Sequence, residues 1–130
     1  MPKILVVDDE PELLQALCVR LTAEGFACEI ASNGREALER IEAQLPDLVI
    51  LDLIMPEISG YEVCRQLQDD PRTAHLPVIV LTAVPQRAII QTAELGAATI
   101  LHKPFDTAIL LATVRHLLKL PSSPGGVSNG

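Results

Sequence analysis

Aromatic residues and positive charges are scarce in this chain of 130 residues. It has no tryptophan, two phenylalanines and one tyrosine, too few for a protein that stacks aromatic rings on nucleic-acid bases. Ten lysines and arginines face seventeen aspartates and glutamates, so the net charge is −7. That sign is wrong for binding a phosphate backbone. We therefore expect no direct contact with nucleic acid.

Cysteine and long apolar runs are also in short supply. The three cysteines, Cys18, Cys28 and Cys64, are odd in number and lack CxxC spacing, which argues against a disulfide framework and a zinc knuckle. No apolar stretch approaches the ~20 residues of a membrane span, and no signal-peptide pattern opens the sequence. The sequence predicts a cytoplasmic protein that makes no membrane contact.

Aliphatic residues, by contrast, are plentiful and fall into five short segments of strand length. The first, third and fourth are continuous apolar runs, typical of parallel strands that are buried on both faces. We expect these three to be the central strands of a sheet. The five segments are Ile4–Val7, Phe26–Ala31, Leu48–Leu51, Val78–Leu81 and Thr99–Leu101.

Segments of helical periodicity follow each predicted strand. In the first of them Leu14, Leu17 and Leu21 share one face, as in a helix that covers a sheet. This alternation predicts a doubly wound, flavodoxin-like α/β domain, with a five-stranded parallel sheet of order 2-1-3-4-5 flanked by five helices. The expected helices are Pro11–Ala23, Arg35–Gln44, Gly60–Gln68, Arg87–Leu95 and Thr107–Leu118.

The length of the chain fits one domain. We assign residues 1–120 to it. Residues 121–130 read PSSPGGVSNG and show no apolar periodicity, so we expect a flexible tail or linker there.

Acidic side chains gather where the predicted strands end. Asp8 and Asp9 follow the first strand and Asp52 follows the third, while Thr82 and Lys103 lie at the ends of the fourth and fifth. Open α/β sheets bind ligands at this edge. Clustered carboxylates repel one another unless a cation lies between them, and oxygen ligands without histidine or cysteine favour Mg²⁺. The sequence therefore predicts a Mg²⁺ site.

This set of residues also indicates a reaction. A carboxylate beside Mg²⁺ and opposite a fixed lysine can attack phosphorus and form an acyl phosphate. The metal ion, Lys103 and Thr82 would neutralise the oxygens of that group.

Six segments together form a highly specific pattern: Ile4–Pro11, Pro46–Leu53, Met55-Pro56 with Gly60 beyond, Leu81–Ala83, Gly96-Ala97 and Lys103–Phe105. In these segments the chain resembles the receiver domain of bacterial two-component response regulators. The resemblance covers residues 3 to about 119.

The resemblance implies a role for each acidic residue. Asp52 would be the phosphoacceptor, Asp9 a direct metal ligand and Asp8 a metal-site carboxylate that often acts through water. The backbone carbonyl of Ile54 would complete the metal shell. The phosphoryl donor would be a phosphohistidine on a sensor histidine kinase or a histidine phosphotransfer domain, with small acyl phosphates as substitutes. Such a domain is a phosphoacceptor rather than an enzyme.

The resemblance also implies how the signal leaves the site. Thr82 would turn toward the phosphoryl group, Lys103 would pair with it, and the bond from Lys103 to Pro104 would be cis. The surface formed by the fourth helix, fifth strand and fifth helix would then change to signal downstream.

The sequence departs from the family pattern in two ways. Ile100 occupies the position of an aromatic residue whose rotamer commonly reports phosphorylation. Ile54 and Val84 are apolar at positions that often carry polar side chains to place the attacking water. Because neither can accept a proton from water or hold water in line, we predict a slow loss of phosphate.

The last predicted helix is unusually apolar. Its leucines, together with Ile109 and Val114, exceed what a helix with one buried face needs. With Ile89 and Ile90 in the preceding helix, this pattern suggests a symmetric dimer through the fourth and fifth helices.

Other functions fit the sequence less well. A phosphatase of the haloacid dehalogenase type also uses an aspartate and Mg²⁺, but its nucleophile follows the first strand in a D-x-D pattern, which Asp8 and Asp9 do not form. A nucleotide-binding domain would need glycines after that strand. A receiver-like interaction module that is never phosphorylated stays open as an alternative, although all five characteristic residues of the site are present.

Overall fold

The protein, analysed as a computed structural model, is described here over residues 1–85 and 96–121. Strands and helices alternate as the apolar pattern predicts. The fourth expected helix, Arg87–Leu95, lies outside the described residues, as does most of the expected tail. The described elements are β1 (Lys3–Val7), α1 (Pro11–Ala23), β2 (Ala27–Ala31), α2 (Gly34–Ala43), β3 (Leu48–Leu51), α3 (Gly60–Asp69), β4 (Val78–Thr82), β5 (Thr99–His102) and α5 (Thr107–Leu117).

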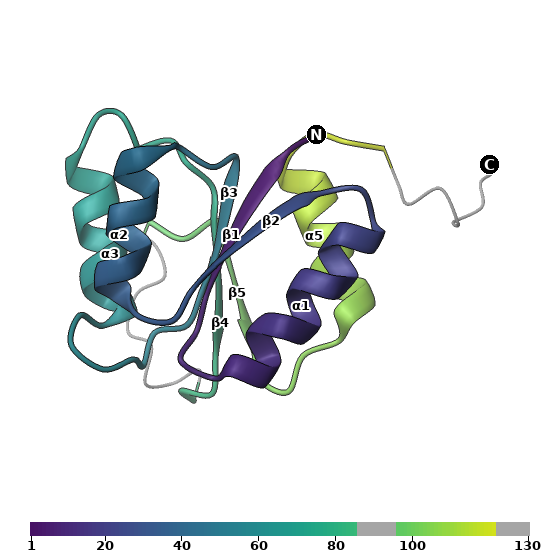
Figure 1. Cartoon of the computed structure of the whole chain (residues 1–130), viewed down its shortest axis with the longest axis horizontal. Coiled ribbons are helices and arrows are strands. Elements are labelled where there is room, and N and C mark those ends of the chain that lie inside the picture. Colours follow the sequence, from purple (N-terminus) through teal and green to yellow (C-terminus); the bar gives the residue numbers. More distant parts are fainter. Residues whose placement is uncertain (86–95, 122–130) are drawn as a thin grey trace.

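The strands form one parallel sheet in the order β2-β1-β3-β4-β5, which confirms the predicted topology. β1, β3 and β4 are central, and every residue of β3 and β4 is buried. Their continuous apolar sequences reflect burial on both faces. Since all strands are parallel, their carboxyl ends meet at one edge of the sheet, the lower edge in Figure 1.

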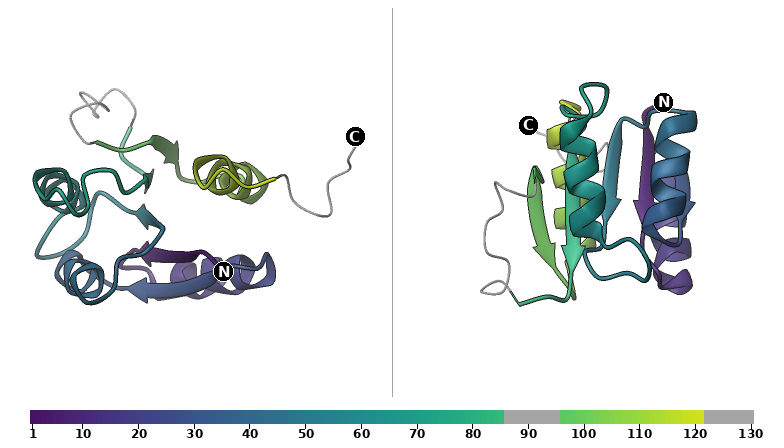
Figure 2. Two further views of the ribbon diagram at one scale, coloured as in Figure 1. Left: turned by 90° about the horizontal axis from the view of Figure 1, so that it is seen from above. Right: turned by 90° about the vertical axis from the view of Figure 1, so that its left-hand side faces the viewer.

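Helices cover both faces of the sheet. α2 and α3 lie on one face and α1 and α5 on the other, as Figure 1 and the view from above in Figure 2 show. A separate cluster of buried side chains lies on each face. Side chains that alternate along a strand supply these clusters: Leu5 and Val7 join the α2/α3 cluster, and Ile4 and Val6 join the α1/α5 cluster.

Local hydrogen bonds set the ends of several elements. The Asn33 side chain accepts a hydrogen bond from the backbone N–H of Glu36, so α2 begins at Gly34, one residue before the predicted start. β2 begins at Ala27 rather than Phe26. The Phe26 backbone N–H donates to the carbonyl of Leu21, and its ring is buried in the α1/α5 cluster. Phe26 thus closes α1 instead of opening the strand.

Most of the apolar side chains of α5 pack into the hydrophobic core. Leu110, Leu111 and Val114 are buried, whereas Ile109 is 55% exposed. Some exposure was expected, but the partner helix of the predicted dimer lies outside the described residues, so the dimer stays a prediction. In the part of the chain that is described, no helix is long and apolar enough to cross a membrane.

Candidate functional site

Three carboxylates converge at the carboxyl edge of the sheet. Asp8 and Asp9 follow β1, Asp52 follows β3, and these two strands are neighbours. One oxygen from each of the three lies within 4.8 Å of the others. Asp8 and Asp52 are only 2% and 6% exposed, while Asp9 is open to solvent. The structure therefore brings the predicted acidic residues together in a half-open cluster.

The backbone holds the two buried aspartates in place. The N–H of Asp52 donates to the carbonyl of Val7 at 3.0 Å, and the N–H of Asp8 donates to that of Ala31 at 3.2 Å. The sheet hydrogen bonding thus continues one residue beyond each strand. The N–H of Glu10 donates to Oδ1 of Asp8 at 2.9 Å, and the N–H of Ile54 lies 3.4 Å from Oδ1 of Asp52. Each carboxylate is oriented by a backbone amide two residues later.

Gly60 lies directly against the backbone of Asp52. Its N–H donates to the carbonyl of Leu53 at 2.8 Å. A Cβ at this position would overlap the carbonyl oxygen of Asp52 and lie 2.6 Å from Cα of Leu53. Glycine is therefore needed here for close approach and not for an unusual φ angle. The start of α3 supports the loop that carries the candidate phosphoacceptor.

Lys103 brings a positive charge to the acidic cluster from the end of β5. Its ammonium group lies 2.8 Å from Oδ2 of Asp8, 3.1 Å from Oε1 of Glu10 and 3.5 Å from Oδ2 of Asp52. Its backbone N–H donates to the carbonyl of Thr82 at 2.8 Å. The peptide bond to Pro104 is cis, as predicted. Lys103 thus joins β4 and β5 to the carboxylates of β1 and β3.

The electrostatics of the site follow from its burial. Burial raises the pKa of Asp52, the negative charge of Asp8 raises it further, and the charge of Lys103 partly offsets both. For Lys103, burial disfavours the ammonium form, but hydrogen bonds to Asp8 and Glu10 and the charges of Asp8 and Asp52 outweigh it and raise the pKa. Lys103 therefore stays charged, whereas burial and the charge of Asp8 disfavour the ionised form of Asp52.

Thr82 lies at the end of β4, fully buried, next to the backbone of Lys103. Its Oγ1 accepts a hydrogen bond from the N–H of Val84 at 3.1 Å. A threonine hydroxyl that accepts one hydrogen bond can still donate its own proton. The Thr82 hydroxyl thus keeps a proton for a second hydrogen bond.

The donor set fits a hard divalent cation. Asp8, Asp9 and Asp52 are the one group of three potential metal-binding side chains within the described ranges, and they offer oxygen atoms only. Carboxylate oxygens suit Mg²⁺, which also keeps open positions for water and phosphate oxygens. The contact between the Ile54 amide and Asp52 places the Ile54 backbone beside the same carboxylate. Its role as a carbonyl ligand stays a prediction.

The residues that depart from the family pattern differ in their surroundings. Ile54 is 59% exposed and its backbone N–H lies next to Asp52, whereas Val84 is half-buried and packs against the α2/α3 cluster. Ile100 is half-buried in β5 and packs against the α2/α3 cluster. These positions carry no polar atom beyond the backbone.

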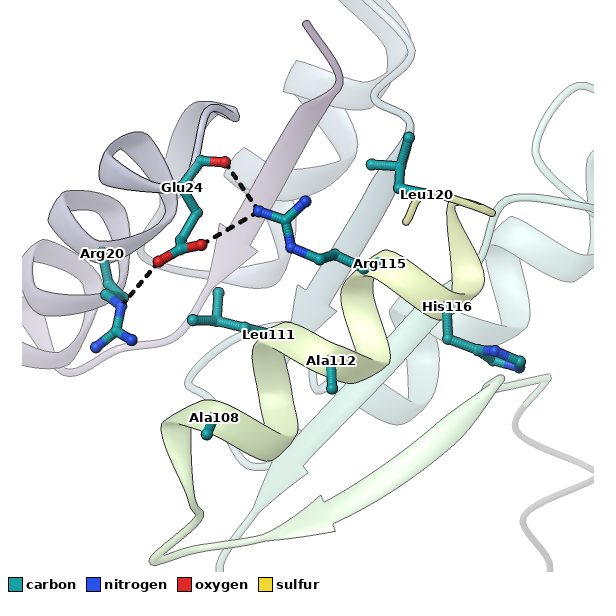
Figure 3. Close-up of a pocket in the computed structure, with 8 residues that line it drawn as sticks. All are labelled: Arg20, Glu24, Ala108, Leu111, Ala112, Arg115, His116 and Leu120. Carbon is teal, nitrogen blue, oxygen red and sulfur yellow. Dashed lines mark hydrogen bonds and ion pairs between the residues drawn. The ribbon is translucent and has the colours of Figure 1, made fainter. Parts of the chain in front are cut away.

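A second hollow lies away from the carboxylates, between the end of α1 and α5 (Figure 3). There Nη2 of Arg115 donates to the backbone carbonyl of Glu24 at 3.1 Å and to its carboxylate at 3.2 Å. The guanidinium also lies over the Phe26 ring, 5.2 Å from its centre. These contacts fasten α5 to α1. The hollow is lined by Arg20, Glu24, Ala108, Leu111, Ala112, Arg115, His116 and Leu120.

Glu10 is the site residue that sequence reasoning missed. Its carboxylate reaches Lys103 although its side chain is 62% exposed. The only signal was its place directly after the acidic pair at the carboxyl edge of the sheet. Acidic residues in loops are common, so that signal alone does not distinguish a site residue from a solvated one.

Comparisons with known proteins agree with this geometry. The family model "Response regulator receiver domain" matches residues 4–115. The response regulator PleD of Caulobacter vibrioides is 43% identical over 90% of this chain, and the phosphate regulon regulator PhoB of Rhizobium meliloti is 42% identical over 92%. The chain spans 26% of PleD and 53% of PhoB, so it corresponds to one part of each relative.

Solved structures give the same result. The signal receiver domain of a histidine kinase from Syntrophus aciditrophicus superposes with a TM-score of 0.86, at 32% identity over 100% of both chains. The response regulator TrrA from Thermotoga maritima, in complex with Mg²⁺ and BeF, gives a TM-score of 0.80 at 36% identity, over 90% of this chain and 99% of that one. With its sheet order, its carboxylate cluster and these matches, the chain belongs to the receiver domain family of response regulators.

Proposed function

We propose that Asp52 accepts a phosphoryl group from a phosphohistidine donor and that the domain acts as a switch controlled by this modification. The observation that carries the proposal is the meeting of Asp52, Asp8, Asp9 and Lys103 at one edge of the sheet. This edge is where α/β sheets bind ligands. The mechanism involves transfer of a group that the partner supplies, so we class the domain as a phosphoacceptor and not as an enzyme.

Asp52 supplies the nucleophile. One carboxylate oxygen attacks phosphorus, a phosphorus–oxygen bond forms, and the phosphorus–nitrogen bond of phosphohistidine breaks. The electron pair of the broken bond goes to the imidazole nitrogen, which takes up a proton from solvent. Burial raises the pKa of Asp52, so its ionised carboxylate is a stronger base than a solvated aspartate. The backbone amide of Ile54 keeps the carboxylate oriented during the attack.

Lys103 supplies a positive charge to the site, and Thr82 supplies a hydrogen-bond donor. The ammonium of Lys103, 3.5 Å from Asp52, is placed to pair with a phosphoryl oxygen, and the Thr82 hydroxyl keeps a proton to donate. Bound Mg²⁺, held by Asp8, Asp9, Asp52 and the carbonyl of Ile54, would neutralise charge on the phosphoryl oxygens. Asp8 is already paired with Lys103, so the two groups also hold each other in position.

The partners follow from this chemistry. The donor is a sensor histidine kinase or a histidine phosphotransfer domain, and small acyl phosphates such as acetyl phosphate can replace it. Phosphorylation of Asp52 changes the surface that β5 and α5 form, through which a second copy or a downstream target binds. We place the reaction in the cytoplasm, where such donors occur.

The experiment measures whether the protein gains the mass of one phosphoryl group. Wild-type protein with acetyl phosphate and Mg²⁺ should gain it, measured by intact mass spectrometry, and Asp52→Asn should not. Asp47→Asn is the matched control, because Asp47 lies at the opposite end of β3, where it accepts a hydrogen bond from the N–H of Lys3 at 2.7 Å. Phosphate on the Asp52→Asn protein, or none on the wild type, would refute the proposal.

A further inference from the structure

The structure assigns to Glu10 a role that rests on the proposed function: it is a positioning residue that holds Lys103 before phosphorylation and is displaced by the incoming phosphoryl group. The carboxylates of Asp8, Glu10 and Asp52 surround the Lys103 ammonium at 2.8, 3.1 and 3.5 Å. A lysine ammonium has three N–H donors. A phosphoryl oxygen can therefore bind Lys103 only if one of these three carboxylates gives way.

Two of the three cannot leave easily. The Asp8 side chain is 3% exposed, and its second oxygen is held by the backbone N–H of Glu10. Asp52 is 8% exposed at its side chain and is itself the proposed acceptor, so it stays in the site after transfer. Moving either carboxylate would leave buried polar groups without a partner.

Glu10 is the partner that can leave. Its side chain is 62% exposed and lines an open hollow beside Lys103 and Pro104, so water can solvate its carboxylate once the contact breaks. An exposed ion pair of this kind contributes little stability. In the resting protein the same contact puts a negative charge next to the ammonium that the phosphoryl group needs. Glu10 thus slows the approach of an anionic donor and frees Lys103 when the donor arrives.

Matched variants separate the contact from the charge. Glu10→Gln removes the charge and weakens the contact. Glu10→Asp keeps the charge but shortens the side chain by one methylene group. Glu12→Gln removes a charge from a residue that lines the same hollow but forms no hydrogen bond with Lys103 in the described part of the chain. Both positions are exposed, so all three variants should fold.

The test is the rate of phosphate gain from acetyl phosphate with Mg²⁺. We expect Glu10→Gln to react about fivefold faster than wild type, as removal of one charge close to Lys103 implies. Glu10→Asp should also react faster, and Glu12→Gln should match wild type within about twofold. NMR of the Lys103 side chain during titration with Mg²⁺ and beryllofluoride should show tighter anion binding for Glu10→Gln.

Several results would overturn the inference. Equal acceleration by Glu10→Gln and Glu12→Gln, with Glu10→Asp unchanged, would show a general charge effect. A slower Glu10→Gln protein would mean that Glu10 assists the reaction, and unchanged rates and anion affinity would mean that its contact is incidental. A wild-type protein that gains no phosphate would remove the proposed function itself, and this inference with it, whereas phosphorylation at equal rates in all variants would remove the inference alone.

Discussion

The two sides of the carboxyl edge differ in how firmly the fold holds them. On one side, β1 and β3 carry the aspartates, and every residue of β3 is buried. On the other, β5 carries Lys103, lies last in the sheet order, and has no fully buried residue. The negative charges of the site thus follow buried strands, and its cation follows a half-buried strand.

This difference in burial suits the different tasks of the carboxylates and the cation. Under the proposed function, the acceptor and the metal-binding carboxylates keep their geometry through repeated transfers, which a buried, densely packed strand favours. Under the same proposal the cation changes partners when the phosphoryl group arrives, and a half-buried edge strand permits that movement. The departures from the family pattern fall on both sides, since Ile54 follows β3, Val84 follows β4 and Ile100 lies in β5.

The largest expected effect is on the free energy of unfolding. It is tested by replacing an isoleucine with alanine in β4 and, separately, in β5. Ile79 in β4 is fully buried, and Ile100 in β5 is half-buried. We expect Ile79→Ala to lower the free energy of unfolding by about 4 kcal/mol and Ile100→Ala by about 1.5 kcal/mol, because the cavity left at Ile100 is partly open to solvent. Urea denaturation measures both values. Equal losses would show that β5 is as tightly packed as the central strands.

A second test concerns the support of Asp52. Gly60→Ala should lower the free energy of unfolding by about 3 kcal/mol, because its Cβ would press on the backbone of Asp52. Gly25→Ala is the control: Gly25 has a φ of +96° but open space around it, so only conformational strain of about 1 kcal/mol is expected. If both variants lose the same stability, close packing at Asp52 is not what Gly60 provides.

The third test addresses the apolar approach to the site. Introducing polar side chains by Ile54→Asn and Val84→Glu should shorten the lifetime of phosphorylated Asp52 by about tenfold each, because each new group can hold the attacking water. Ile54→Leu keeps the apolar surface and should leave the lifetime unchanged. The lifetime is measured by mass spectrometry after removal of the phosphodonor. Equal or longer lifetimes in the polar variants would contradict the prediction.

The smallest expected effect is on stability against pH. Because the pKa of Asp52 is raised in the fold, its ionised form costs stability, and this cost grows as the pH rises through the raised pKa. Asp52→Asn should therefore raise the free energy of unfolding by about 1 kcal/mol at neutral pH. The gain should vanish below the ordinary aspartate pKa of 3.8, where both side chains are neutral. If Asp52→Asn is less stable than wild type at pH 7, the prediction is wrong.

Sequence reasoning succeeded where one local signal suffices. Continuous apolar runs identified β1, β3 and β4 as central strands, because burial on both faces leaves no polar alternation. It placed the start of β2 one residue early, because Phe26 has strand propensity, whereas its ring and backbone close α1. The aspartates were expected together because parallel strands end at the same edge.

Two side-chain contacts between distant segments could not be predicted. The pairing of Glu10 with Lys103 joins residues 93 positions apart, and an exposed glutamate carries no pattern that identifies its partner. The contact of Arg115 with Glu24 is of the same kind, 91 positions apart. The close approach of Gly60 to Asp52 likewise has its cause in backbone geometry that no periodicity reveals.

The position of β5 between the two layers has a further consequence. Ile100 packs against the α2/α3 cluster, and its neighbour Leu101 packs against the α1/α5 cluster. A single strand therefore touches both hydrophobic layers, and the residue that follows its last position is the lysine of the site. If that strand slides or tilts, side chains on both faces of the sheet must repack, so a protein bound to either face would sense the same chemical event.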